Sequence, residues 1–347
     1  MLTLFAAVRL GQVIYDIVGC GAVVRTYHVP VLRYLARTAP IAVSGCFDID
    51  PASAAGVAGL LGARGHAGAD WIPSPAAAAA LVTTPPGSHG EIARRYLAAG
   101  KHVFVEKPFV GSADEARRLV QQARAADRRI LVAHFRRFYP SLRTARQFLA
   151  AGGLGRIRRV EATEGARWEW PAQSSYFLQD PYGGVVWDTG AHLVDMLLYA
   201  LSLDEPGRAL QCHTRERVQR PAREPAHDYR AVLELTLDGG AGVDVRLALS
   251  RLEPLAGALK LYGEAGVLVI PTTFALAPTL FRGAERFELE SAAPDLAARD
   301  SLGCFVLEHL EFLAACASHT PSVLDADRFV GLSGLLAQLT APGEGRE

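Results

Sequence analysis

The stretch VIYDIVGCGAVVRTYHVP, residues 13–30, decides the fold. An apolar run ends in Gly19-Cys20-Gly21, and apolar residues at helical spacing follow. Glycines between a strand and a helix allow a tight turn and let a pyrophosphate approach the N-terminus of the helix. The stretch therefore predicts the first strand and helix of a dinucleotide-binding domain. We expect cofactor contacts from Gly19, Gly21, Ala22 and Val23.

Short apolar runs alternate with helical patterns as far as residue 134. Near-continuous apolar strands that alternate with helices predict a parallel, doubly wound sheet whose ligand crevice lies at the carboxyl ends of the strands. The predicted strands are 13–18, 41–47, 79–84, 102–105 and 130–134. The predicted helices are 24–37, 51–62, 89–100 and 113–126, with Gly62 and Gly100 at helix C-termini.

The pattern changes after about residue 150. Long β runs predict a second, mostly antiparallel sheet, with one hairpin turning at residues 238–240. These runs cover residues 156–165, 229–250 and 257–271, and helical segments cover 189–201, 301–318 and 325–340. The predicted fold class is α/β: an N-terminal Rossmann domain (13–134), preceded by an extension (1–12), and a C-terminal α+β domain with a large open sheet (135–347).

Composition narrows the class of protein. Lys plus Arg equals Asp plus Glu, 36 each, so net charge favours neither nucleic acid nor an anionic membrane as a partner. The five cysteines are widely spaced, which suits a reducing compartment. We find no run approaching the roughly eighteen apolar residues of a membrane span. These features together predict a cytoplasmic protein with a small-molecule partner.

The second predicted strand, IAVSGCFD, ends in Asp48. An acid at this position accepts hydrogen bonds from the adenosine ribose and repels a 2′-phosphate. No arginine follows directly, so the sequence favours NAD over NADP. The alternative is a solvated acid that caps the helix starting near Pro51.

The stretch HVFVEKPFV, residues 102–110, ends a buried strand in a charged pair and a proline. If this strand borders the crevice, Glu106 and Lys107 lie at the nicotinamide half of the cofactor. A lysine ammonium there would hydrogen-bond a substrate oxygen during hydride transfer. A cis peptide bond before Pro108 is a further expectation.

Downstream, YGGVVWDTGAHLVDMLL (182–198) places Asp188 and His192 four residues apart, on one side of a predicted helix. A histidine beside a carboxylate is a plausible proton shuttle near neutral pH. Asp188 as a helix N-cap and His192 as an ordinary half-buried histidine are the alternative. We find no third ligand at metal-binding spacing and predict no metal.

These motifs, in this order, resemble the glucose–fructose oxidoreductase / inositol dehydrogenase / MocA (Gfo/Idh/MocA) oxidoreductase family. The resemblance covers nearly the whole chain past residue 12 and implies a nicotinamide-dependent oxidation or reduction of a sugar, cyclitol or related polyol. It implies that Lys107, Asp188 and His192 are catalytic. It also implies that the residues around the nicotinamide ribose are Thr84, Pro85, Pro86 and His89, and that Arg137 matches the arginine before the family's F-x-P.

The chain departs from the family at Val24, where Gly or Ala is usual, and at residues 68–80, a segment that is shorter than is usual in the family. The expected mechanism has His192 as general base, Lys107 bonded to the reacting oxygen, and Asp188 orienting both. The aromatic and cationic residues expected to shape the substrate pocket are Arg136, Arg137, Trp168, Trp170 and Tyr176.

Three other functions stay open from the sequence: a reductase of a nucleotide-linked ketosugar or an imine, a redox-neutral NAD-dependent glycosidase or epimerase, and a ligand-sensing regulator. The intact Lys107, Asp188 and His192 argue against the regulator. The open sheet predicts a homodimer or homotetramer, because an exposed sheet face of that size is usually covered.

Overall fold

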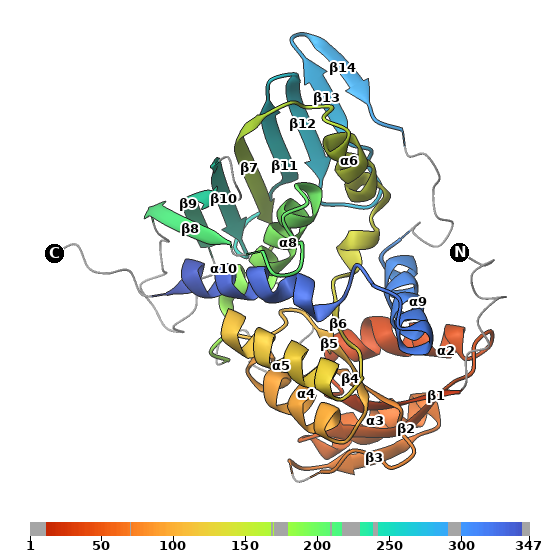
Figure 1. Ribbon diagram of the computed structural model, residues 1–347. Helices are drawn as coiled ribbons and strands as arrows, with labels where there is room; N and C mark the ends of the chain where they lie inside the picture. Colours follow the sequence, from red (N-terminus) through yellow and green to blue (C-terminus); the bar gives the residue numbers. More distant parts are fainter. Residues whose placement is uncertain are drawn as a thin grey trace.

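A computed structural model describes residues 12–69, 71–167, 169, 180–208, 210–216, 230–238, 242–290 and 300–341. The chain forms two sheets, one at each end of the molecule, and helices lie around and between them (Figure 1). The predicted fold class, a Rossmann domain followed by an α/β domain with a second, mostly antiparallel sheet, is confirmed. Trp168, Trp170, Tyr176, the predicted turn at 239–240 and the extension 1–11 lie outside the described residues.

The first sheet has six parallel strands in the order β3-β2-β1-β4-β5-β6. Its central strands are buried on both faces because helices cover both, so an apolar run without alternation is what such a strand needs. The strands are β1 (Val13–Val18), β2 (Ile41–Asp48), β3 (Arg64–Ala67), β4 (Ala79–Val82), β5 (His102–Glu106) and β6 (Ile130–Ala133). The strand order reverses between β1 and β4, which places a crevice at their carboxyl ends.

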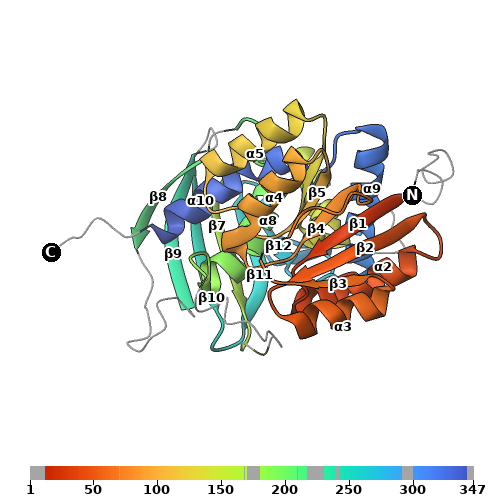
Figure 2. The ribbon, with the colours of Figure 1, turned by 90° about the horizontal axis from the view of Figure 1, so that it is seen from below.

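Helices pack on both sides of this sheet, as Figure 2 shows from below. They are η1 (Val24–His28), α2 (Val29–Leu35), α3 (Pro51–Leu61), η2 (Pro86–Ser88), α4 (His89–Ala98) and α5 (Ala113–Ala125). Asp50 caps α3 by accepting from the Ser53 amide at 2.9 Å, and Ser112 caps α5. Gly62 and Gly100 adopt left-handed backbone at the ends of α3 and α4, as predicted.

The second sheet has eight strands in the order β14-β13-β12-β11-β7-β10-β9-β8, all paired antiparallel except β7 with β10. The strands are β7 (Ile157–Gly165), β8 (Gln211–Glu216), β9 (Arg230–Asp238), β10 (Val243–Ser250), β11 (Leu255–Gly263), β12 (Gly266–Pro271), β13 (Thr279–Arg282) and β14 (Glu285–Glu288). Solvent-facing charges pair across it, for example Arg246 with Glu234 at 3.0 Å. That this sheet forms a homodimer or homotetramer stays a prediction.

The remaining helices join the two sheets. They are η3 (Phe135–Phe138), α6 (Pro140–Ala150), η4 (Val186–Gly190), α8 (Ala191–Ala200), α9 (Ser301–Ser318), η5 (Ala326–Phe329) and α10 (Val330–Thr340). Helix α10 crosses the middle of the molecule beside α5, and α9 returns to the first domain beside α2 (Figure 1). The predicted boundary between residues 134 and 135 falls between β6 and η3, but α9 and α10 bring the end of the chain back across it.

Helix α9 corrects one expectation from the sequence. Its 18 residues, Ser301–Ser318, are long and apolar enough to cross a membrane by length and composition alone. In the structure α9 buries one face, which includes Phe305, His309 and Phe312, against η1, α2 and η3. A buried core helix passes the same test of length and composition, so α9 is weak evidence for a span.

Candidate active site

One cavity of about 1370 Å³ runs along the carboxyl ends of the first sheet and reaches η4, α8 and the end of β10. Pockets for drug-sized ligands are about 300–1,000 Å³, so this one has room for a dinucleotide and a small substrate together. Residues from the glycine loop, the strand ends and the second domain line it. The crevice predicted from the sequence is present.

The glycine loop forms one end of this cavity. Gly19 has φ +94°, and a Cβ built on it would lie 2.6 Å from the main chain of Thr83 and Thr84, so only glycine fits. Gly21, Ala22 and Val23 line the cavity, and no atom lies within 4 Å of a Cβ built on Gly21. Val24 is fully buried where η1, a π-helical turn, begins. The loop therefore leaves open space where a pyrophosphate would approach the chain.

Asp48 lies at the cavity wall, at the end of β2. Its Oδ2 accepts from the Cys20 amide at 2.6 Å, and its Oδ1 accepts from the Asp50 amide at 2.9 Å. The cap of α3 is Asp50, so the alternative role for Asp48 as that cap does not apply. Arg25 lines the same end and donates to the Ser53 hydroxyl at 2.9 Å. Arg25 precedes Asp48 in the sequence and was not predicted to lie beside it.

Thr84, Pro85 and Pro86 line the cavity beside the glycine loop. His89, which the resemblance places near the ribose, lies behind them and is buried. Its Nδ1 lies 2.9 Å from the Pro108 carbonyl oxygen and its Nε2 lies 2.8 Å from that of Thr84. Burial lowers the pKa of His89, despite these carbonyls. His89 therefore braces two loops of the site and does not line the cavity.

Lys107, Asp188 and Arg251 form an ionic cluster at the other end of the cavity. The Lys107 Nζ donates to Asp188 Oδ1 at 2.7 Å and to the Asp188 carbonyl at 3.2 Å. Arg251 donates to Asp188 Oδ2 from Nη2 at 2.5 Å and from Nε at 3.1 Å. Burial alone would raise the pKa of Asp188, but the two cations outweigh it and lower that pKa to about 2. Asp188 is therefore an anion that holds the lysine in place.

His192 lies one turn after Asp188 and lines the same cavity. Asp188 lies within η4, and Val185 is the N-cap residue of that helix, so the alternative role of Asp188 as an N-cap does not apply. The Nδ1 of His192 is buried and has no hydrogen-bond partner among the described residues. Burial, and then the charges of Lys107 and Arg136, hold the pKa of His192 well below its usual value. A neutral imidazole beside a lysine is equipped to accept a proton.

Glu106 lines the cavity, but its carboxylate is engaged from behind. Oε2 accepts from the Lys107 amide at 3.0 Å, and Oε1 lies 3.0 Å from Nε2 of the buried His28. The Lys107–Pro108 peptide bond is cis, as predicted. Both residues of this strand end therefore line the cavity, and the Glu106 carboxylate also holds the main chain of Lys107.

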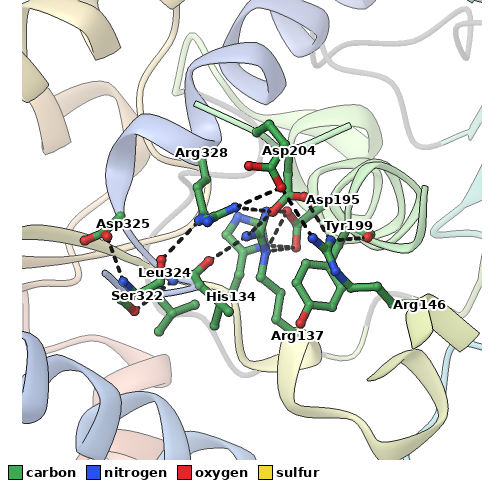
Figure 3. Close-up of polar contacts among 12 residues, drawn as sticks. His134, Arg137, Arg146, Asp195, Tyr199, Asp204, Ser322, Leu324, Asp325 and Arg328 are labelled. Atoms are coloured by element: carbon green, nitrogen blue, oxygen red, sulfur yellow. Dashed lines mark hydrogen bonds and ion pairs between the residues drawn. The ribbon is translucent and has the colours of Figure 1, made fainter. Parts of the chain in front are cut away.

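The two arginines of the FRRF turn lie in different places. Arg136 lines the cavity and pairs with Glu164 through two hydrogen bonds of 2.6 and 2.7 Å. Arg137, the residue singled out from the sequence, is 1% exposed and does not line the cavity. It pairs with Asp195 at 2.6 Å and with Asp204 at 3.0 Å (Figure 3). Arg137 is therefore a structural residue in this molecule, and its neighbour Arg136 faces the cavity.

Two further observations complete the site. Tyr182 and Arg251 line the cavity and were not predicted. Arg251 follows the last residue of β10, and an end-of-strand position was the only signal for it in the sequence. Among the described residues no group of three His, Cys, Asp or Glu side chains could hold a metal ion.

Comparisons with known proteins agree with this architecture. Residues 14–134 match the family model described as oxidoreductase family, NAD-binding Rossmann fold, and residues 142–269 match the GFO/IDH/MocA C-terminal domain. The chain belongs to the Gfo/Idh/MocA oxidoreductase family, as the sequence motifs indicated.

The individual relatives share less than a third of their aligned residues with this chain. The chain is 29% identical over 259 residues to inositol 2-dehydrogenase of Ralstonia nicotianae, covering 74% of this chain and 73% of that protein. It is 29% identical over 161 residues to uncharacterized oxidoreductase C115.03 of Schizosaccharomyces pombe, covering 46% and 43%. The chain thus spans under half of that yeast relative's length. The 3-ketoreductase KijD10 of Actinomadura kijaniata, solved with NADP and TDP-benzene, superposes with a TM-score of 0.76 at 19% identity, covering 94% and 96%. At that identity the likeness shows the fold alone.

Proposed function

We propose that this protein transfers a hydride between NAD(H) and a secondary alcohol or ketone of a sugar, cyclitol or related polyol. The observation that carries the proposal is the position of Lys107, Asp188 and His192. They share a cavity with a glycine loop that leaves room for a dinucleotide pyrophosphate. When bound, the nicotinamide ring would supply the hydride acceptor or donor.

The side chains have distinct roles in this proposal. His192 accepts the proton of the substrate hydroxyl, because its imidazole is neutral at physiological pH and its pKa is lowered by burial. Lys107 donates a hydrogen bond to the same oxygen and stabilises negative charge there. Asp188 keeps the lysine ammonium at its position, and Arg251 keeps Asp188 ionised. In the reverse direction His192, once protonated, returns the proton to the oxygen.

The charges around this end of the cavity favour a neutral substrate. Each of the three cations beside His192 is already paired with a carboxylate: Lys107 and Arg251 with Asp188, and Arg136 with Glu164. A diphosphate or a uronate would need cations that are not neutralised in this way. We therefore place a free polyol, the class that the inositol 2-dehydrogenase relative is named for, ahead of a nucleotide-linked ketosugar.

For the cofactor we propose NAD ahead of NADP. Asp48 would accept from the ribose hydroxyls and repel a 2′-phosphate. Arg25 and Ser53, at the same end, are the residues that would weaken this preference. Replacement of Arg25 by alanine should therefore weaken binding of NADP more than binding of NAD, as measured by quenching of tryptophan fluorescence.

The deciding experiment is reduction of NAD and NADP against a panel of free sugars, cyclitols and nucleotide-linked sugars. Wild type, Lys107→Ala and the control Lys101→Ala are assayed together. We expect turnover of a free polyol, lost by at least about 10²-fold in Lys107→Ala and kept in Lys101→Ala. Turnover of nucleotide-linked members alone would contradict the proposed substrate class. Nucleotide released on denaturation, without net turnover, would indicate redox-neutral chemistry. Absence of nucleotide binding would overturn the proposal.

A further inference from the structure

A chain of three buried side chains lies behind Lys107 and reaches a helix from the end of the sequence. Glu106 ends β5, His28 ends η1 and His309 belongs to α9. His28 and His309 are fully buried, and Glu106 is 8% exposed. His28 is 281 residues from His309 and 78 from Glu106, so only the fold brings the three together.

The hydrogen bonds among His309, His28 and Glu106 all run in the same direction, toward Glu106. His28 Nε2 lies 3.0 Å from Glu106 Oε1. Burial would raise the pKa of Glu106, but the hydrogen bond from His28 and the charge of Lys107 outweigh burial and lower that pKa. The Glu106 carboxylate is therefore an anion and accepts a hydrogen bond from His28. His28 therefore carries a proton on Nε2. Its Nδ1 lies 2.9 Å from Nε2 of His309, and one proton must lie between these two nitrogens.

The surroundings of His309 decide where that proton resides. The Nδ1 of His309 has no hydrogen-bond partner among the described residues. If His28 were the donor, His309 would need its own proton on this buried Nδ1, where no acceptor receives it. Burial holds the pKa of His309 well below its usual value. His309 is therefore neutral and donates from Nε2 to His28.

The rings are held in place by aromatic side chains. His309 contacts Phe104 edge to face at 5.2 Å between centroids and Tyr15 at 6.2 Å, and His28 contacts Phe305 at 5.2 Å. The titratable neighbours are neutral: burial raises the pKa of the Tyr15 phenol, and burial with the charge of Glu106 raises the pKa of Glu308. Of Tyr15, Glu308 and Glu106, Glu106 is the ionised residue, and it is the final acceptor of the hydrogen bonds from the two histidines.

We propose that His309 and His28 are positioning residues for the catalytic lysine, an inference that rests on the proposed function. His309 orients His28, His28 orients the Glu106 carboxylate, and Glu106 Oε2 holds the main-chain amide of Lys107 at 3.0 Å. The Lys107 ammonium then reaches Asp188 at 2.7 Å. Docking of α9 on the first domain thereby completes an active site to which α9 contributes no reacting group.

The test compares three substitutions in α9. His309→Leu removes the donor to His28, and His309→Gln keeps a donor near the same place. Phe312→Leu removes buried volume one turn on, beside the Phe104 and Tyr15 rings that also contact His309, and leaves the three hydrogen-bonding side chains unchanged. We expect His309→Leu to lower kcat by about tenfold, with KM and the Kd for NADH within about threefold of wild type. We expect His309→Gln and Phe312→Leu to keep kcat within about threefold.

Two spectroscopic readouts do not depend on the substrate. The protein has three lysines, Lys101, Lys107 and Lys260, so ¹³C-labelling of lysine Cε gives few signals, and Lys107→Ala assigns the one of interest. Its signal should move in His309→Leu and stay in the other two variants. In ¹⁵N-histidine spectra His309 should be a neutral Nε2–H tautomer from pH 6 to pH 8.

The outcomes separate cleanly. If the Lys107 signal is unchanged in His309→Leu, or moves equally in Phe312→Leu, the positioning role is wrong. If His309 carries its proton on Nδ1, or titrates near pH 6.5, the proposed hydrogen bond from His309 to His28 is wrong. If wild type turns over no substrate, the proposed function fails, while the lysine and histidine spectra still decide whether α9 positions Lys107.

Discussion

Two clusters in this molecule combine the same kinds of side chain and differ in what they can do. The active-site cluster contains Lys107, Asp188, Arg251 and His192. The interior cluster, drawn in Figure 3, contains Arg137, Asp195, Asp204, His134, Arg146 and Arg328. Each pairs cations with a carboxylate and has a histidine nearby.

The difference lies in exposure and in the histidine. Arg137 and Asp195 have side chains that are 1% and 0% exposed, against 15% and 10% for Lys107 and Asp188. His134 is fully buried, 3.2 Å from Asp195, and does not line the cavity, whereas His192 lines it. A closed ionic cluster holds parts of the chain together, and one that opens on a cavity lined by a histidine can react with a ligand.

The largest effect should come from breaking the interior cluster. Arg137→Leu leaves Asp195 and Asp204 buried beside too little positive charge, which we expect to lower the free energy of unfolding by about 3–5 kcal/mol. Urea denaturation measures it. The matched control is Arg136→Leu at the cavity wall, where a partly exposed pair with Glu164 is lost. An equal loss of stability in both variants would contradict the distinction between the two clusters.

The next effect should separate the two histidines by activity. His192→Gln removes the proposed base and should lower kcat by about 10²-fold or more, with little change in the midpoint of thermal unfolding. His134→Gln should do the reverse and lower stability while kcat per folded molecule is kept. Steady-state kinetics and calorimetry on both variants check this. If kcat falls in His134→Gln and not in His192→Gln, His192 is not the base.

His192 should also make stability depend on pH. Its pKa is lowered in the folded state, so the unfolded chain binds more protons below pH 6.5 and stability falls as the pH drops. Between pH 7.5 and 5.5 a histidine of this kind removes about 1.4 kcal/mol. Glu308 has a raised pKa and acts in the opposite sense, so the measured quantity is the difference between wild type and His192→Gln. Identical pH profiles of unfolding free energy would show that His192 titrates normally.

Much of the fold could be predicted because its signals are local. β1 and α9 have the predicted limits, since apolar runs and helical spacing are read within one segment. The elements β3, β8, β13, β14 and α6 were not predicted from the sequence. All four residues of β3 are exposed, so its pairing with β2 leaves no apolar pattern. The parallel pairing of β7 with β10 depends on the topology and has no local signal.

The same contrast applies to the site. Lys107, Asp188 and His192 lie in motifs that can be recognised along the sequence. Arg251 and His309 reach the site or its support only through strands and helices that pack from far along the chain. The FRRF turn was the hardest part of the site to predict. Arg136 and Arg137 are neighbours in a short helix, and the sequence does not show which of the two faces the cavity.

The smallest predicted effect tests whether the active-site cluster needs its second cation. Arg251→Gln removes the guanidinium that pairs with Asp188 Oδ2, while Asp188 Oδ1 still accepts from Lys107. Because one cation then remains to offset burial, the pKa of Asp188 should rise from about 2 while staying below neutrality. We expect kcat to fall by about five- to tenfold, roughly 1 kcal/mol, and the acid limb of the kcat profile to move to higher pH. The control is Arg246→Gln, which removes an exposed ion pair on β10, the strand that Arg251 follows. A loss of substrate binding with unchanged kcat would instead mean that Arg251 contacts the substrate, and the cluster would then include a binding residue that its pairing with Asp188 conceals.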